Sequence, residues 1–440
     1  MAGHPERIPR WDVLDEHLAE GGFRWSRWNQ SLDAPDYTLD EVVELEEMAI
    51  AHVDALVLGG QPVAKRLLVP ALVDEEPERV VVAALALLDA ERPSGTAAVL
   101  DALPQAEPPA LAALQRAFEL SPTAVLPAGL TALLTQEDGA PELFALALDS
   151  VGAHGLATSA VCTPFLSHPE PRVAAAALRA ASQSRLPLEP ARLQRALDSS
   201  EPALRDAAIL AGLMSGAYGA WSACRALAGT PGGRLPLLLL GMSGDAHDTK
   251  RLLELLPDEK LQPDVLWALG FCGRVTAADA CLELMRKTPV AALAGEAFSA
   301  ITGLSISERF AAPPEDEADP LPPLEDEDLD ADLSSRPEGA LPKPHVEAIS
   351  AWWKEARQRM GTQQRFLAGQ PFTPRVLLEA IASAPMRRRH ALALELALRS
   401  RGAIQVQTRT FTAKQVASWK EACAASVAAF SRPFSEGLRG

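Results

Sequence analysis

A pair of glycines recurs at a nearly constant interval through the middle of this 440-residue chain. The pairs are Gly152/Gly155, Gly212/Gly216, Gly241/Gly244 and Gly270/Gly273. Their first members are separated by 60, 29 and 29 positions, so one unit between the first two pairs does not carry the mark. A fixed period of this length indicates a repeat architecture, in which each unit buries its apolar face against its neighbours.

Two further signals share this period. Similar apolar runs begin at Val80, Val173 and Leu204, and the steps between them are three periods and one. Glu-Pro or Gln-Pro pairs stand before the repeated runs, and proline suits the first turn of a helix. These pairs are Glu76-Pro77, Glu170-Pro171, Glu201-Pro202 and Gln262-Pro263. The pattern predicts units of two helices, the first of which ends at the Leu-Gly or Ala-Gly step.

The composition supports helices throughout. Aromatic residues make up only 5% of the chain, which argues against a β-sandwich or barrel. The runs WALGFCGRVTAADACLELM from Trp267 and LLGMSGDAHDTKRLLELL from Leu239 resemble the short HEAT-like repeats of phycobilin lyases. We therefore expect an all-α, right-handed HEAT-like α-solenoid over residues 40–306. An N-terminal capping segment (1–39), an acidic Pro-rich linker (307–340) and a helical C-terminal segment (341–440) complete the predicted organisation.

The N-terminal segment is rich in tryptophan. Trp25, Trp28 and Leu32 are spaced i, i+3 and i+7, which places them on one face of a helix. That face has two interpretations: it seals the end of the first repeat, or it is an aromatic docking patch for a partner. Thr38 and Glu41 match a capping box at the start of the next helix.

Helical spacing resumes after the linker. Apolar residues predict three helices, over Ile349–Ala356, Val376–Ala384 and Ala391–Leu398. Residues 403–408 alternate between apolar and polar side chains, which predicts a short strand.

Charge is distributed unevenly along the chain, whose net charge is −17. Residues 313–332 contain ten acidic residues and no Lys or Arg, whereas residues 333–440 contain 17 Lys/Arg against seven Asp/Glu. We expect residues 313–335 to be mobile because their carboxylates repel one another. The acidic run also lies close in sequence to the basic segment, which allows a weak, salt-sensitive latch between them.

The sharpest basic feature is Arg387-Arg388-Arg389-His390, followed by Arg399 and Arg401. One interpretation is a solvated face with ordinary ion pairs. Another is docking to the acidic linker or to an acidic partner. Nucleic acid is the weakest of the three, because the acidic repeats would repel phosphate.

No pattern of catalytic residues emerges. The phosphate-binding, dinucleotide-binding and nucleophile-elbow motifs are absent, and no His-Glu dipeptide is present to hold the iron of a HEAT-repeat hydroxylase. Ser243, Asp245 and His247 are better explained as an inter-helix turn whose Ser and Asp cap the next helix. Cys272 and Cys281 are expected to pack as small apolar residues. We predict no catalytic residue, cofactor or metal.

Cysteine usage and hydropathy bear on location. The five cysteines form no Cys-x-x-Cys pair, which favours a reducing compartment. The first ten residues are polar, and apolar stretches such as Leu235–Met242 are too short to cross a bilayer. We expect a cytoplasmic protein with no membrane contact.

Three segments resemble one bacterial family of HEAT-repeat proteins that are encoded beside type VI secretion genes. The segments are EHLAEGGFRWSRWNQSL from Glu16, AHVDALVLGG from Ala51, and WWKEARQRMGTQQRFLAGQPFTPRVLLEAI from Trp352 with its continuation over residues 389–399. The resemblance implies a context in type VI secretion and supplies no catalytic residue.

Together these features favour a non-enzymatic scaffold or adaptor that binds a protein partner, with a secretion component or effector as one class. An immunity protein that covers a toxin is an alternative, and a lyase-like enzyme of the bilin-lyase type is another. The candidate partner-binding residues are Arg387, Arg388, Arg389, Arg399, Arg401, Trp25 and Trp28. The sequence does not set the oligomeric state.

Overall fold

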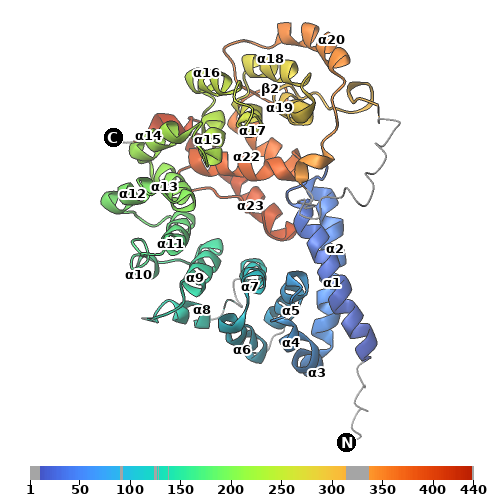
Figure 1. Cartoon of the computed structure of the whole chain (residues 1–440), viewed down its shortest axis with the longest axis vertical. Coiled ribbons are helices and arrows are strands. Elements are labelled where there is room, and N and C mark those ends of the chain that lie inside the picture. Colours follow the sequence, from blue (N-terminus) through green and yellow to red (C-terminus); the bar gives the residue numbers. More distant parts are fainter. Residues whose placement is uncertain are drawn as a thin grey trace, which may run out of the picture. The chain divides into compact units, whose positions relative to one another are not determined.

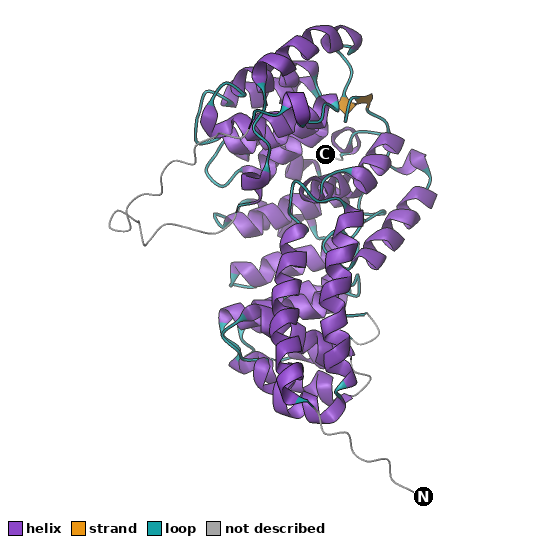
Figure 2. Ribbon diagram, turned by 90° about the vertical axis from the view of Figure 1, so that its right-hand side faces the viewer, coloured by secondary structure: helices purple, strands orange, loops and turns teal. Residues whose placement is uncertain are grey.

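The computed structural model describes residues 10–438 except 90–92, 123–125, 127, 137 and 314–335. The described residues are mostly helical. Two short strands, β1 (Phe366–Leu367) and β2 (Gln370–Pro371), form an antiparallel ribbon (Figure 2), and Ala311 and Pro344 form an isolated antiparallel bridge. The prediction of an all-α protein is therefore confirmed. The predicted mobility of the acidic run falls on residues that lie, almost all, outside the described ranges.

The chain divides into two compact units. Unit 1 comprises Met1–Leu32, Tyr37–Ala223 and Ala393–Gly440, and unit 2 comprises Asp33–Asp36 and Cys224–Leu392. Helices α14 (Tyr218–Leu227) and α22 (Met386–Arg399) contribute residues to both units.

The other helices of unit 1 are α1 (Trp11–Ser31), α2 (Leu39–Leu58), α3 (Gly60–Val63), α4 (Val69–Ala71), α5 (Pro77–Asp89), α6 (Pro93–Ala102), α7 (Pro108–Leu120), α8 (Ala128–Leu133), α9 (Pro141–Ala153), α10 (Ser159–Cys162), α11 (Pro171–Gln183), α12 (Pro190–Leu197), α13 (Pro202–Ser215) and α23 (Thr412–Ala424). A π-helical turn, Ala64–Leu68, joins α3 to α4. Those of unit 2 are α15 (Arg234–Ser243), α16 (Ala246–Leu255), α17 (Gln262–Cys272), α18 (Val275–Leu284), α19 (Ala291–Thr302), α20 (Val346–Ala356) and α21 (Pro374–Ser383).

In unit 1 the helices α5, α7, α9, α11 and α13 form a row in which each contacts the next (Figure 1). Shorter helices, among them α8, α10 and α12, precede members of this row and pack against them. At its start, α1 packs against α2 and α5. Helices α15, α17 and α19 form a similar row in unit 2.

The predicted helix starts are correct. Helices α5, α11 and α13 begin at the proline of their Glu-Pro pair, and α17 begins at Gln262. Thr38 and Glu41 form the predicted capping box, with the Thr38 N–H donating to a Glu41 carboxylate oxygen at 2.7 Å. The three predicted C-terminal helices correspond to α20, α21 and α22.

The predicted helix ends need a correction, because each helix continues beyond the first glycine of its pair. That first glycine allows neighbouring helices to approach closely: a Cβ on Gly241 would lie 2.2 Å from the carbonyl oxygen of Ala268. In unit 2 the helix ends just before the second glycine, at Gly244 and Gly273, whose φ values are +63° and +68°. Only the second glycine serves the left-handed turn.

The unit without a glycine mark is present in the structure. After α11 the left-handed position is taken by Arg185, with φ +55°. This position lies one period after Gly155 and one period before Gly216. The turn geometry therefore repeats where the sequence signal does not.

Candidate functional site

Unit 1 contains a cavity of about 870 Å³ at the C-terminal ends of α7, α9 and α11. Residues from these helix ends, including Arg116, Asp149 and Arg179, form one wall. The opposite wall is formed by residues 402–410 and by α23. Since all of these residues belong to unit 1, the cavity is a feature of that unit alone.

Residues 402–410 cross the helix ends as a non-helical segment, which we call the C-terminal strap. The Gln405 side-chain amide donates to the Gln183 carbonyl oxygen at the end of α11, at 3.0 Å. The Gln407 amide donates to the Ala153 carbonyl oxygen at the end of α9, also at 3.0 Å. These carbonyls belong to the last turns of their helices, where no N–H of the same helix is available to them.

The predicted strand over residues 403–408 is wrong, since these residues form no strand. The alternation of apolar and polar residues that suggested a strand has a different structural explanation. Val406 and Thr408 are buried, while Gln405 and Gln407 donate to a row of helix ends instead of to a neighbouring strand.

The far end of the strap is fastened to α1 and α2. The ring of Phe411 packs on Trp28, with centroids 5.1 Å apart. The Thr412 N–H donates to Glu46 Oε2 at 2.7 Å, and its hydroxyl donates to Glu46 Oε1 at 2.8 Å. Glu46 therefore caps the start of α23. Burial raises the pKa of Glu46, although the hydrogen bonds from Thr412 oppose that shift.

This contact revises the interpretation of the tryptophans. Trp28 is fully buried and touches the protein's own C-terminal region, so it offers no docking surface. Leu32 is buried as well, and Trp25 is half-buried.

Two ion pairs lie along the cavity wall, Arg179 with Asp149 and Arg116 with Glu119. Arg179 on α11 makes a bidentate pair with Asp149 on α9, at 2.8 and 2.7 Å. Burial opposes the charge on Arg179, but the Asp149 carboxylate outweighs it and raises the pKa of the guanidinium. On α7, Arg116 faces Glu119 at 3.4 Å.

His154 follows α9 and also lines the cavity. Its Nε2 lies 2.8 Å from the Phe118 carbonyl oxygen at the end of α7, a geometry that suits donation by a neutral ring. Burial lowers the pKa of His154, and the nearby Lys414 adds to this, while the Phe118 contact opposes it.

A second, smaller cavity of about 380 Å³ lies in the same unit. Its lining is mainly apolar and includes Ile50, Val53, Leu85 and Phe411. Thr410 lines both cavities, so the strap borders each of them.

Four of the predicted partner-binding arginines are buried, which contradicts an exposed basic patch. In unit 2, Arg387 faces Glu296 and Glu338, and Arg388 donates to the Gly270 carbonyl oxygen at 3.0 Å. Their guanidiniums also lie over the Trp267 ring.

Arg389 and Arg399 are also buried and bonded to groups of the protein itself. Arg389 donates to the Ile381 carbonyl oxygen at 2.7 Å, and burial lowers its pKa to about 10. In unit 1, Arg399 pairs with the buried Glu395 at 2.7 Å. Arg401 remains exposed. The latch predicted between the acidic run and the basic segment requires exposed arginines, and four of the five are buried. The acidic run itself lies, almost all, outside the described residues.

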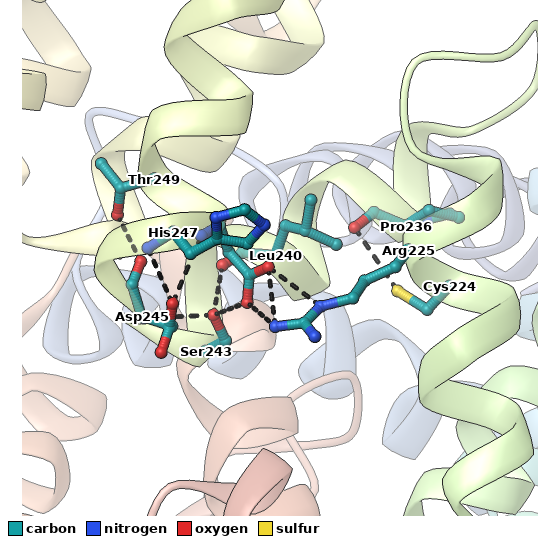
Figure 3. Close-up of polar contacts among 9 residues, drawn as sticks. Cys224, Arg225, Pro236, Leu240, Ser243, Asp245, His247 and Thr249 are labelled. Carbon is teal, nitrogen blue, oxygen red and sulfur yellow. Dashed lines mark hydrogen bonds and ion pairs between the residues drawn. The ribbon is translucent and has the colours of Figure 1, made fainter.

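The capping role predicted for the turn at Ser243 is correct for Asp245 and wrong for Ser243 (Figure 3). Asp245 accepts hydrogen bonds from the N–H groups of His247 and Asp248, and His247 is exposed. Ser243 donates to the Leu240 carbonyl oxygen at 2.8 Å, so it caps the preceding helix instead of the next one. Asp248 is buried and makes a bidentate pair with Arg225, at 3.0 Å for both bonds.

The described cysteines are free thiols, and all except Cys423 are buried. Cys272 and Cys281 pack in the interior as expected, and burial raises the pKa of both. Across the described ranges, no group of three His, Cys, Asp or Glu residues is placed to hold a metal ion. No described helix combines the length and apolar character that a bilayer span needs.

Sequence reasoning missed most of the cavity. Gln405, Gln407, His154 and Arg185 carry no motif. One signal was available: Asp149 and Arg179 are one repeat apart, and opposite charges at that separation predict an ion pair between neighbouring helices.

Comparisons with known proteins add little. No protein-family model matches the chain, and no curated protein matches it. Among solved structures, the chain is similar to the crystal structure of an engineered protein, with 16% identity and a TM-score of 0.29 over 66% of this chain and 88% of the other. A likeness at this level carries no functional argument.

Proposed function

We propose that this protein is a non-enzymatic scaffold that binds an extended segment of a partner protein in the cavity of unit 1. The C-terminal strap carries this proposal. It is itself a non-helical segment lying across the ends of α9 and α11, and its amides satisfy carbonyls there. The cavity beside it leaves room for a second segment to lie against the same row of helix ends.

The chemistry of helix ends supports this use of the surface. The last four carbonyls of a helix have no partner inside that helix. At the ends of α9 and α11 several of them already accept one hydrogen bond from the following turn or from the strap. Each carbonyl oxygen has a second lone pair, so the row of helix ends can still accept hydrogen bonds from another segment. An extended chain offers donors at regular intervals as well, from its main chain and its side chains. A partner segment would therefore find polar contacts without a need for one particular sequence.

We further propose that the helix row of each unit is built as a right-handed HEAT-like solenoid. The support is the contact of each row helix with the next and the left-handed turn that recurs once per period from Gly155 to Gly303. Solenoids bind partners along extended surfaces more often than they enclose a reaction centre.

The resemblance to proteins encoded beside type VI secretion genes makes a component or effector of that apparatus the first partner class to test. A cytoplasmic location belongs to the same proposal. An immunity protein that covers a toxin would use the same surface, and the identity of the bound partner separates the two roles.

The test is affinity capture of the tagged full-length protein from its own cells, with quantitative mass spectrometry of what stays bound. Two variants accompany the wild type. Ala425→Trp places an indole at a residue that lines the cavity, and Ala417→Trp places the same group on an exposed position of α23 that does not.

We expect one or more proteins to be retained by the wild type and by Ala417→Trp but lost with Ala425→Trp. Thermal unfolding of all three confirms that the comparison is between folded proteins. The proposal is wrong if every captured protein is retained equally by the two tryptophan variants.

A further inference from the structure

Arg185 stands where the neighbouring turns of unit 1 have glycine. The turns after α9, α11 and α13 close with the same two main-chain hydrogen bonds. The N–H of Arg185 donates to the Ser182 carbonyl oxygen at 3.1 Å, and that of Leu186 donates to Ala181 at 2.8 Å. Gly155 and Gly216 begin the equivalent pairs after α9 and α13. The three turns thus have the same backbone hydrogen bonds, and the turn after α11 differs from the other two by carrying an arginine side chain in place of glycine.

A residue with a Cβ is disfavoured in this backbone conformation, since φ is +55° at Arg185. Non-glycine residues in such conformations cluster at functional sites, where the surrounding structure holds them in place. Packing alone does not call for a large residue in these turns, because a Cβ on the equivalent Gly155 would meet nothing within 4 Å.

The Arg185 side chain lies at the cavity. It is exposed and lines the cavity, and its stem passes over Gly402 of the strap. No hydrogen bond or ion pair joins its guanidinium to any described residue. By contrast, the nearby Arg179 and Arg116 each face a carboxylate.

The charge of the cavity favours an anionic group. Four arginines line it, at positions 116, 179, 185 and 409, against three carboxylates, at positions 119, 149 and 421. This positive excess occurs in a chain whose net charge is −17. Guanidinium is the side-chain group best matched to a carboxylate, because it donates two parallel hydrogen bonds.

We propose that Arg185 recognises an aspartate or glutamate side chain in the extended partner segment. This inference rests on the proposed function, and it adds a specificity-determining residue and an acidic partner to it.

The probe is a phage-displayed library of random peptides, selected on immobilised full-length protein and counter-selected on Ala425→Trp. We expect the enriched peptides to share an acidic residue at one position. Their dissociation constants are then measured by fluorescence anisotropy for the wild type, Arg185→Gly and Arg185→Lys.

The matched control is Glu308→Gly. Glu308 is also an exposed non-glycine residue with positive φ, at +50°, but it does not line the cavity. Arg185→Gly should weaken binding about tenfold or more, Arg185→Lys by less, and Glu308→Gly should leave it unchanged. Both glycine variants should melt at or above the wild-type temperature, because each relieves the same backbone conformation.

A double-mutant cycle completes the test. Replacing the shared acidic residue of the peptide by its amide should weaken binding to the wild type and have little further effect on Arg185→Gly. Cavity-binding peptides without an acidic residue, or with equal affinity for Arg185→Gly, would overturn this inference and leave the proposed function standing. Failure to select any peptide that distinguishes the wild type from Ala425→Trp would overturn both.

Discussion

In unit 2, residues 365–369 lie directly against the ends of α17 and α19, where their main-chain N–H groups and the side chain of Arg365 donate to helix-end carbonyls. The N–H of Phe366 donates to the Gly273 carbonyl oxygen at 2.8 Å, and that of Ala368 donates to the Ala300 carbonyl oxygen at 2.8 Å. In unit 1 the C-terminal strap reaches the ends of α9 and α11 through the side chains of Gln405 and Gln407. Because side chains hold the backbone of the strap farther away, unit 1 has room for a cavity where unit 2 has direct contact.

The glycines of the repeat record this difference. A Cβ on Gly273 would lie 2.1 Å from the Phe366 carbonyl oxygen, and one on Gly303 would lie 2.6 Å from that of Ala368. A Cβ on Gly155 would meet nothing within 4 Å. In unit 2, glycine is therefore favoured for two reasons, its positive φ and the close approach of residues 365–369. In unit 1, the positive φ is the only one of these two reasons that applies at Gly155. Where the second reason is absent, arginine replaces glycine at position 185.

The sharpest way to break this comparison is to add a methyl group to equivalent glycines. Gly273→Ala should lower the free energy of unfolding by about 3 kcal/mol or more, because the left-handed conformation costs about 1–2 kcal/mol and the clash displaces residues 365–369 as well. Gly155→Ala should lower it by the conformational cost alone, about 1–2 kcal/mol. Urea denaturation of the two variants measures both, and equal losses would show that the contact with Phe366 adds nothing.

A second test removes the side chains that hold the strap. Gln405→Ala together with Gln407→Ala deletes two hydrogen bonds to helix-end carbonyls, each worth about 0.5–1.5 kcal/mol. Because the cavity lets water reach those carbonyls, we expect about 1–2 kcal/mol in total. Hydrogen exchange should become faster in residues 402–411 and stay unchanged in residues 365–369. Unchanged exchange in the strap would mean that Phe411 and Thr412 hold it unaided.

The smallest expected effect is a pH dependence from His154. Burial lowers the pKa of its ring below the ordinary value of 6.5, so the folded state binds a proton less readily than the unfolded state. Stability from this residue is therefore complete above about pH 6.5 and is lost as the pH falls below that value.

The matched variant is His154→Gln, whose amide can donate to the Phe118 carbonyl oxygen without titrating. Urea unfolding at about pH 7.5 and about pH 5.5 should show a smaller loss on acidification for the variant than for the wild type. An equal loss in both proteins would assign the acid sensitivity to other groups, among them His52, whose pKa burial also lowers.

The local rules of helix formation made much of this fold readable from the sequence. Pro77, Pro171 and Pro202 set helix starts because proline lacks an N–H that the first turn does not need. The glycine period set the turns because a left-handed residue without a Cβ costs little. Both signals depend only on a few neighbouring residues, so they can be recognised in the sequence without knowledge of the tertiary contacts.

What only the tertiary structure decided was which surfaces meet. The arginines at 387–389 were candidates for an exposed patch, yet they are buried, two of them against Glu296 and Trp267. The alternation at residues 403–408 was real, but its partner was a row of helix ends from a much earlier part of the chain. Charge and alternation in the sequence indicate which kind of partner a side chain can bind. Which residue becomes that partner depends on long-range packing, and a local sequence pattern does not encode long-range packing.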